Sequence, residues 1–154
     1  MSRPSLPVGR LLERKNTGGV VAVAPGDTVL DAVKLMAERD IGAVVVLDQG
    51  RLVGILSERD CARELALGSR NARDIKVAEV MTPDVVTIGP AETVGECGAL
   101  LMTRHHVRHL PVVEGGRVLG VVSARDLLAE QVSEEVRQVS DLETERLMVN
   151  TGSY

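Results

Sequence analysis

Two short motifs carry the most visible chemistry in this sequence. Gly54-Ile-Leu-Ser-Glu-Arg-Asp60 returns 66 residues later as Gly120-Val-Val-Ser-Ala-Arg-Asp126, each time after an apolar run and before a helix-like stretch. A strand-to-helix turn directs free N–H groups and the positive end of the helix toward its surroundings, and this favours a bound anion. The serine hydroxyl can donate to a phosphate oxygen, and the aspartate can accept from a vicinal diol. Together these groups indicate a nucleotide.

The same motif has a purely structural interpretation, because Ser-x-x-Asp is close to the capping box of a helix N-terminus. One occurrence alone would favour that interpretation. The recurrence of the motif, each time after a strand and with a glycine three residues before the serine, favours a ligand site. Arg59, inside the first motif, is predicted with equal weight to contact phosphate or to lie on a solvated helical face, and a solvated face is also the alternative for Arg63 and Arg125.

A dense basic cluster, Arg104-His-His-Val-Arg-His109, lies between an expected helix and an expected strand. Arg104 and His105 fit a solvated helix end, where cations oppose the negative end of the helix dipole. His105 and His109 have the spacing of a metal-binding pair on a helix. The change from helix to strand between them breaks that geometry, and no carboxylate or cysteine is near in sequence, so no metal is predicted.

The two motifs belong to a longer internal repeat. Residues 25–39 match residues 90–104 at an offset of 65, whereas the later parts match at 66, and the change is expected at the turn where Gly115-Gly116 stands against Gly50. Each copy reads strand, helix, strand, strand, helix. The expected strands are Val20 to Val23, Ala43 to Leu47 and Leu52 to Leu56 in the first copy, and Val85 to Ile88, Leu110 to Val113 and Val118 to Val122 in the second.

Further segments flank the repeats. Helical leads are expected at Val8 to Lys15 and Val77 to Met81, and Thr28 and Thr93 are expected to cap the helices that follow the first strands. The predicted organisation is a first repeat at 8–67, a linker at 68–76, a second repeat at 77–130 and a C-terminal helical tail at 131–154. The tail forms one helix or a broken pair, with Ser140-Asp-Leu-Glu143 able to cap a separate last helix.

Composition limits the classes of function. The chain has 154 residues with 44% hydrophobic content, which favours two small halves that share a core. Tyr154 is the only aromatic residue and the net charge is -4, so neither a stacking platform for single strands nor a footprint for duplex nucleic acid is expected. No apolar run is long enough to span a membrane, and a soluble, cytoplasmic protein is expected. Cys61 and Cys97 are predicted to be core thiols.

Over about residues 8 to 130 the sequence resembles paired cystathionine beta-synthase (CBS) domains, also called a Bateman module. The resemblance is carried by Val77 to Pro83, by His109 to Val113 and by both Gly-x-x-Ser-x-x-Asp endings. As a whole the chain is similar to small stand-alone bacterial CBS proteins of the signal-transduction type. The resemblance implies an α/β (α+β) fold in which two pseudo-symmetric β-α-β-β-α repeats pack sheet to sheet, with an appended C-terminal helix.

The resemblance also implies a ligand and the residues that hold it. Adenosyl compounds such as AMP, ATP, NAD or S-adenosylmethionine would bind in the cleft between the repeats, none as an obligatory cofactor, with AMP, ATP and NAD favoured. Arg108 and His109 would reach phosphate, and the first copy offers Ala43-Val44 at the equivalent positions, so unequal sites are expected. The full assignment is Asp60 and Asp126 for ribose, Ser57, Ser123, Arg108, His109 and Arg59 for phosphate, and mainly the backbone of Val20, Val85 and Ala43 for adenine.

The leading functional hypothesis is a non-enzymatic regulatory module that senses an adenine nucleotide. The alternative is a dimerisation or scaffold module with vestigial ligand sites, and an enzyme using His105, His106 and Asp126 as acid–base groups ranks last. The resemblance implies a homodimer, with the helix faces at Val29 to Ala37 and Val94 to Met102 as candidate surfaces or simply as core. The output would pass to an unidentified protein target, with no nucleic acid and no membrane as partner.

Overall fold

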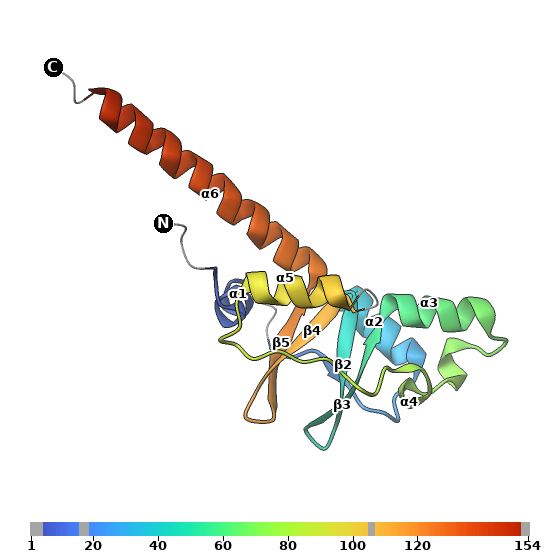
Figure 1. Ribbon diagram of the computed structural model, residues 1–154. Coiled ribbons are helices and arrows are strands. Elements are labelled where there is room, and N and C mark those ends of the chain that lie inside the picture. Colours follow the sequence, from blue (N-terminus) through green and yellow to red (C-terminus); the bar gives the residue numbers. More distant parts are fainter. Residues whose placement is uncertain (1–4, 16–18, 105–106, 152–154) are drawn as a thin grey trace.

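The structure is a computed structural model that describes residues 5–15, 19–104 and 107–151 (Figure 1). It has the expected mixed α/β fold, with two repeats, small sheets and a C-terminal helix. In chain order the elements are α1 (Val8–Lys15), β1 (Ala22–Val23), α2 (Val29–Arg39), β2 (Ala43–Asp48), β3 (Arg51–Ser57), α3 (Glu58–Leu67), a 3-10 turn (Ala72–Asp74), α4 (Val77–Val80), α5 (Val94–Thr103), β4 (His109–Glu114), β5 (Arg117–Ser123) and α6 (Ala124–Thr151).

The first repeat has a three-stranded sheet and the second a two-stranded sheet. β1 pairs in parallel with β2, which pairs antiparallel with β3, while β4 pairs antiparallel with β5. The strand predicted at Val85 to Ile88 was wrong, since only Ile88 forms an isolated parallel bridge there, to Val112. Pro111 explains the loss of this strand, because it occupies the position that Val45 has in the first repeat. The Val45 N–H donates to the Val21 carbonyl at 3.4 Å and helps to pair β1 with β2, whereas proline has no N–H to donate.

The two hairpins have turns of equal length. Asp48 pairs with Arg51 and Glu114 with Arg117, and both central residues of each turn have positive φ, as a type I′ turn requires. The insertion expected at this turn is therefore not there. It lies before the strand instead: counted from the matched residues Arg39 and Arg104, three residues (40–42) precede β2 whereas four (105–108) precede β4. The extra residue belongs to the basic cluster.

The helix that leads each repeat packs on the other repeat. The N–H of Val8, at the start of α1, donates to the carbonyl of Glu92 at 2.8 Å, and the N–H of Val77, at the start of α4, donates to the carbonyl of Asp27 at 2.8 Å. The hairpins also touch each other through β3 and β5 (Figure 1). The spatial halves are therefore not the same as the consecutive repeats, and the exchange of leading helices ties them together.

Each half has its own aliphatic core. One contains Val23, Val29, Ala32, Met36, Val44, Val46, Leu56, Cys61, Ile75 and Val77, and the other Val8, Ile88, Val94, Cys97, Leu110, Val112, Val122 and Leu127. Both cysteines are core thiols as predicted, and burial raises the pKa of each to about 11. The faces of α2 and α5 proposed as dimer surfaces mostly supply core residues instead.

The C-terminal segment is one continuous helix, which is the first of the two predicted possibilities, and no separate helix begins at Ser140. The Ser140 carbonyl accepts from Thr144 Oγ1 at 2.9 Å inside α6, and residues 131–151 contain no glycine or proline that would end a helix. α6 packs at its beginning against α5 and β5 and then extends far from the domain (Figure 1). Within the described ranges, no helix has the length and apolar character needed to cross a bilayer.

Candidate functional site

Two cavities lie where the repeats meet, and each takes its walls from both. We call them by their aspartates. The Asp126 pocket, of about 460 Å³, is lined by Lys15, Gly19, Val20, Val21, Asp40, Ile41, Gly42, Ala43, Glu58, His109, Gly120, Val121, Ser123, Arg125 and Asp126. The Asp60 pocket, of about 700 Å³, is lined by Gly42, Ile55, Ser57, Glu58, Arg59, Asp60, Arg63, Thr82, Asp84, Val85, Val86, Val107, Arg108 and His109. Both have the size of small-molecule sites.

The Ser-x-x-Asp motifs are capping boxes and pocket walls at once. The Ser57 N–H donates to Asp60 Oδ2 at 3.0 Å and the Asp60 N–H donates to Ser57 Oγ at 3.1 Å. Ser123 and Asp126 repeat this with 2.9 and 3.0 Å. Every hydrogen bond that the described residues donate to these two carboxylates ends on Oδ2. Oδ1 of each is thus the oxygen that could accept from a ligand's diol.

The glycine that opens each motif has a steric reason. A Cβ on Gly54 would lie 2.5 Å from Met81 Sδ and 3.1 Å from the carbonyl oxygen of Thr82, and a Cβ on Gly120 would lie 2.9 Å from Leu12 Cδ2. The 2.5 and 2.9 Å approaches are closer than real Cβ contacts, so the side chain of Met81 or Leu12 would have to shift. Met81 follows α4 and Leu12 lies on α1, so the glycines let the exchanged leading segments seat against β3 and β5 beside the pockets.

The Asp60 pocket brings together most of the residues predicted to bind phosphate. Ser57 and Arg59 come from the first repeat, whereas Arg108, His109 and the predicted adenine contact Val85 come from the second. Three arginines and three carboxylates line this pocket, the arginines being Arg59, Arg63 and Arg108 and the carboxylates Glu58, Asp60 and Asp84.

The serine of this pocket already has an acceptor in the structure. Ser57 Oγ donates to Asp60 Oδ2 at 2.8 Å. Its hydroxyl proton would have to turn away from that carboxylate to reach a phosphate oxygen, because a hydroxyl has one donor.

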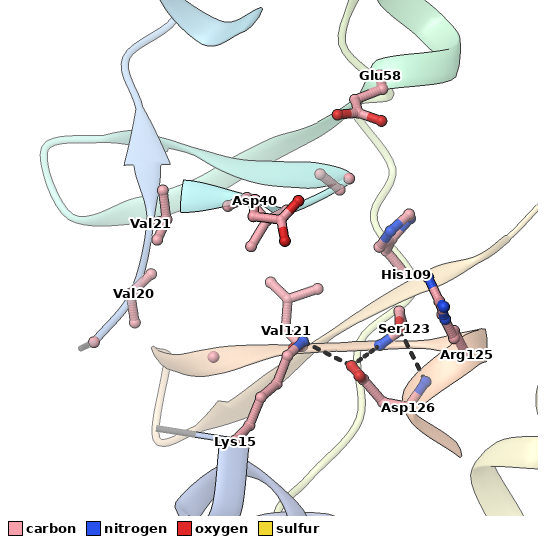
Figure 2. Close-up of a pocket in the computed structure, with 15 residues that line it drawn as sticks. Lys15, Val20, Val21, Asp40, Glu58, His109, Val121, Ser123, Arg125 and Asp126 are labelled. Carbon is pink, nitrogen blue, oxygen red and sulfur yellow. Dashed lines mark hydrogen bonds and ion pairs between the residues drawn. The ribbon is translucent and has the colours of Figure 1, made fainter. Parts of the chain in front are cut away.

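The Asp126 pocket contains a residue that the sequence interpretation missed. Lys15 Nζ lies 2.7 Å from Asp126 Oδ2 (Figure 2). The same ammonium group donates to the Val121 carbonyl at 3.2 Å. Lys15 ends α1, which is the leading helix of the other repeat. The predicted residues Val20, Ala43, Ser123 and Asp126 all line this pocket. Only knowledge that the leading helices are exchanged could have connected Lys15 with Asp126.

The ion pair sets the ionisation of Asp126. Partial burial alone would raise the pKa of this carboxyl group. The hydrogen bond and charge of Lys15, together with the hydrogen bond from the Ser123 backbone, outweigh burial and lower the pKa below its ordinary value. Asp126 is therefore held as a carboxylate, and a ligand diol would share it with Lys15.

His109 lies between the two pockets and lines both. Burial is the largest influence and lowers its pKa, and the positive charges of Lys15 and Arg108 add to that effect, whereas Asp126 and Asp60 oppose it. A Cβ on Gly42 would lie 3.3 Å from His109 Nε2, so the two strand entries are in close contact. A phosphate beside this imidazole would favour its protonated form.

Strand register corrects one predicted equivalence. Ala43 pairs with Ser57 and His109 pairs with Ser123, so His109 corresponds to Ala43 rather than to Val44. Arg108 then corresponds to Gly42, and the carbonyls of both accept from the first residue of the following helix, at 2.8 and 2.9 Å. The expected inequality of the sites keeps its basis, because Arg108 lines the Asp60 pocket and glycine stands in its place beside the Asp126 pocket.

The pockets differ in charge as well as in volume. The Asp126 pocket has Lys15 and Arg125 against three carboxylates, those of Asp40, Glu58 and Asp126. His105 and His106, considered as acid–base groups or, for His105, as part of a metal pair, lie outside the described residues. In the part of the chain that the structure describes, no three histidine, cysteine, aspartate or glutamate side chains are grouped so that they could hold a metal ion.

Comparison with known proteins identifies the family. The model of the CBS domain matches this chain twice, over residues 11–67 and 77–133, so the chain belongs to the CBS domain family and contains a pair of these domains. The CBS domain-containing protein YhcV of Bacillus subtilis is 34% identical over 119 residues, which are 77% of this chain and 84% of that protein.

Solved structures agree with the fold. A protein with CBS domains from Burkholderia ambifaria is 40% identical with a TM-score of 0.76, over 82% of this chain and 94% of that one. The CBS domain pair of protein MJ0100, solved in complex with 5′-methylthioadenosine and S-adenosyl-L-methionine, is 26% identical with a TM-score of 0.72, over 85% of this chain and 99% of that one. The chain is thus a CBS pair of the regulatory type.

Proposed function

We propose that this chain is a non-enzymatic regulatory module that binds an adenosyl ligand between its two CBS domains. The observation that carries the proposal is the composition of the pockets. Each combines the Ser-x-x-Asp motif of one repeat with the entry segment of the other, Val85 in the Asp60 pocket and Val20 in the Asp126 pocket. The complex of MJ0100 supports the ligand class.

In the Asp60 pocket the proposed ligand is phosphorylated, such as AMP, ATP or NAD. Asp60 Oδ1 would accept from the ribose diol, and the phosphate would lie near Arg108, His109 and Arg59, with Ser57 as a further donor once its hydroxyl turns. Three arginines can neutralise a phosphate, and charge-assisted hydrogen bonds of this kind are stronger than neutral ones. Adenine would meet mainly the backbone at Val85.

In the Asp126 pocket the proposed ligand is less anionic. Two cations face three carboxylates there, and Lys15 already occupies part of Asp126. An adenosyl compound with a neutral or positively charged tail, as S-adenosylmethionine has, fits this balance better than a polyphosphate. Adenine would lie beside the backbone at Val20 and Ala43.

The signal would be a change in how the repeats sit relative to each other. Because each pocket has walls from both repeats, a bound ligand adds contacts that depend on their relative position. A ligand can shift such an equilibrium only by the difference in its affinity for the two arrangements. A homodimer, a cytoplasmic location and a still unidentified protein target complete the proposal.

One observation favours the alternative, a dimerisation or scaffold module, for one of the sites. Asp126 Oδ2 is already held by a 2.7 Å ion pair with Lys15 Nζ, and this pair competes with a ribose diol for the carboxylate. If that pair persists with every ligand, the Asp126 pocket is vestigial, and the Asp60 pocket alone carries the ligand.

The test is calorimetric titration of nucleotide-free protein with AMP, ATP, NAD and S-adenosylmethionine, in the wild type and in the Asp60→Ala and Asp126→Ala variants. Asp31→Ala is the matched control, because Asp31 forms a capping box of the same kind with Thr28 at the start of α2 but lies in neither pocket. Binding that is lost pocket by pocket, and kept in the control, supports the proposal. Absence of heat and of thermal stabilisation with all four compounds would favour the scaffold.

A further inference from the structure

The exposed part of α6 carries an apolar stripe that the domain does not cover. Its members are Leu128, Val132, Val136, Val139, Leu142 and Val149, with exposed fractions from 51% to 74%. With 3.6 residues per turn these positions fall on one face of the helix. The other face turns to the domain near its start, where Leu127 and Glu130 are buried and Glu134 accepts from the Leu6 N–H at 3.1 Å.

The stripe has the spacing of a coiled-coil seam. Val132, Val139 and Arg146 are seven residues apart and form one set of seam positions. Leu128, Glu135, Leu142 and Val149 form the other set, again at intervals of seven. Each set therefore contains one charged residue among aliphatic ones, and the two charges have opposite sign.

We infer that this stripe pairs with α6 of a second copy of the chain, in antiparallel orientation, about a twofold axis between Ser140 and Asp141. In an antiparallel pair, the first set of one helix faces the second set of the other. Val139 then faces Leu142 of the second copy, and Val132 faces its Val149. In the same register, Glu135 faces Arg146 of the second copy, and each of these contacts occurs twice.

Charge selects this arrangement over its rivals. In a parallel pair in register, Glu135 would face Glu135 of the second copy and Arg146 would face Arg146, which places two like-charge contacts in the seam. The antiparallel register converts both into opposite-charge contacts and leaves every aliphatic seam position from 132 to 149 with an aliphatic partner. It also places the two CBS pairs at opposite ends of the helix pair.

A partner for this segment is also expected from helix physics. The part of α6 beyond Glu134 comprises residues 135–151 and is about 26 Å long at 1.5 Å per residue. Most helix stability in proteins comes from a packed apolar face rather than from helix propensity, and this part of α6 has no such packing against the domain. Pairing supplies that face without any ligand, so this inference rests on the homodimer of the proposed function and not on its ligand sites.

Charge reversal tests the pairing in the full-length chain by sedimentation equilibrium. Glu135→Arg places arginine opposite Arg146, and Arg146→Glu places glutamate opposite Glu135, so each single variant should dissociate into species of half the mass, with Kd raised about tenfold or more. The double variant E135R/R146E restores opposite charges only in the antiparallel register, and its Kd should return to that of the wild type.

Two controls keep the outcome interpretable. Thr144→Arg adds a charge to α6 on the side away from the stripe and should leave the mass unchanged. Circular dichroism of each variant checks that the domain is folded. Val139→Asp leaves residues 135 and 146 unchanged and should still dissociate the pair, because it places a charge at an aliphatic seam position. A wild-type monomer at all concentrations, single variants that assemble like the wild type, or a double variant that stays dissociated would each overturn the inference.

Discussion

Changing Asp60 to asparagine should separate the two roles of this residue. In the structure Asp60 Oδ2 accepts from the Ser57 backbone at 3.0 Å and closes the cap of α3, while Oδ1 is the proposed acceptor for the ribose diol. The side chain in the Asp60→Asn variant keeps one oxygen for the cap. It presents an NH₂ group, which is a donor, where the diol needs an acceptor.

The expected effects differ greatly in size. Asp60 is the third helical residue of the capping box whose first member is Ser57, and asparagine keeps an oxygen that can accept from the Ser57 N–H. One such hydrogen bond contributes about 0.5–1.5 kcal/mol, so its retention should limit the change in the free energy of unfolding to about 1 kcal/mol. Loss of a hydrogen bond to a charged acceptor costs about 1.5–3 kcal/mol, which corresponds to a rise of roughly 10- to 150-fold in the Kd of a phosphorylated adenosyl ligand.

The assay is calorimetric titration with AMP and with its 2′-deoxy analogue, beside urea unfolding of each protein. The wild type should bind the 2′-deoxy compound more weakly than AMP, and Asp60→Asn should bind both equally, because its diol contact is already lost. Asp31→Asn makes the same change in the equivalent cap of α2 and should leave binding intact. An Asp60→Asn protein that is folded and still prefers AMP over the 2′-deoxy analogue would refute the assignment of Asp60 to ribose.

Two further predictions concern packing and ionisation. Gly54→Ala brings a Cβ within 2.5 Å of Met81 Sδ and should lower the free energy of unfolding, measured in urea, by about 1–3 kcal/mol. Gly26→Ala is the control and should be nearly neutral, because its Cβ would meet no heavy atom within 4 Å. Equal stabilities of the two variants would contradict the steric argument. Lys15→Met should raise the pKa of Asp126, followed by carboxyl-carbon NMR. The folded-state pKa of Asp126 is lowered, so this carboxylate stabilises the fold above the ordinary aspartate pKa, and the stabilisation is lost as pH falls through the lowered value. The free energy of unfolding should therefore drop less between about pH 6 and about pH 3 in Lys15→Met than in the wild type.

Much of the fold could be predicted because the same pattern of strands, helices and caps occurs twice in the sequence. The apolar runs, the capping threonines and the two motifs recur at fixed spacing, and the structure places strands, helices and caps at nearly all of those positions. The missing strand at Val85 to Ile88 shows the limit. Pro111, a single residue 23 positions beyond Ile88, removes the N–H on which the pairing would depend, and residue spacing does not reveal which strand lies beside which.

The repeat predicted the motif residues of the site, whereas Arg108 and His109 were expected from the resemblance and also line a pocket. Ser57, Asp60, Ser123 and Asp126 recur as a motif, and all four line pockets. Lys15 belongs to no recurring motif. Its ion pair with Asp126 depends on the exchange of the leading helices, which is a property of the tertiary structure. The position of the insertion was wrong for a related reason.

That insertion was assigned from sequence to a glycine-rich turn. Strand register shows both turns equal and places the extra residue in the basic cluster, ahead of His109. Sequence matching alone could not decide between two nearby positions for a gap, because few identical residues separate them.

The most direct test of the central claim is a crystal structure of the protein with AMP. The account predicts the ribose hydroxyls within hydrogen-bond distance of Asp60 Oδ1, the phosphate beside Arg108 and His109, and adenine against the backbone at Val85. A ligand whose ribose contacts neither Asp60 nor Asp126, or pockets that stay empty at saturating AMP while Lys15 still holds Asp126, would contradict it.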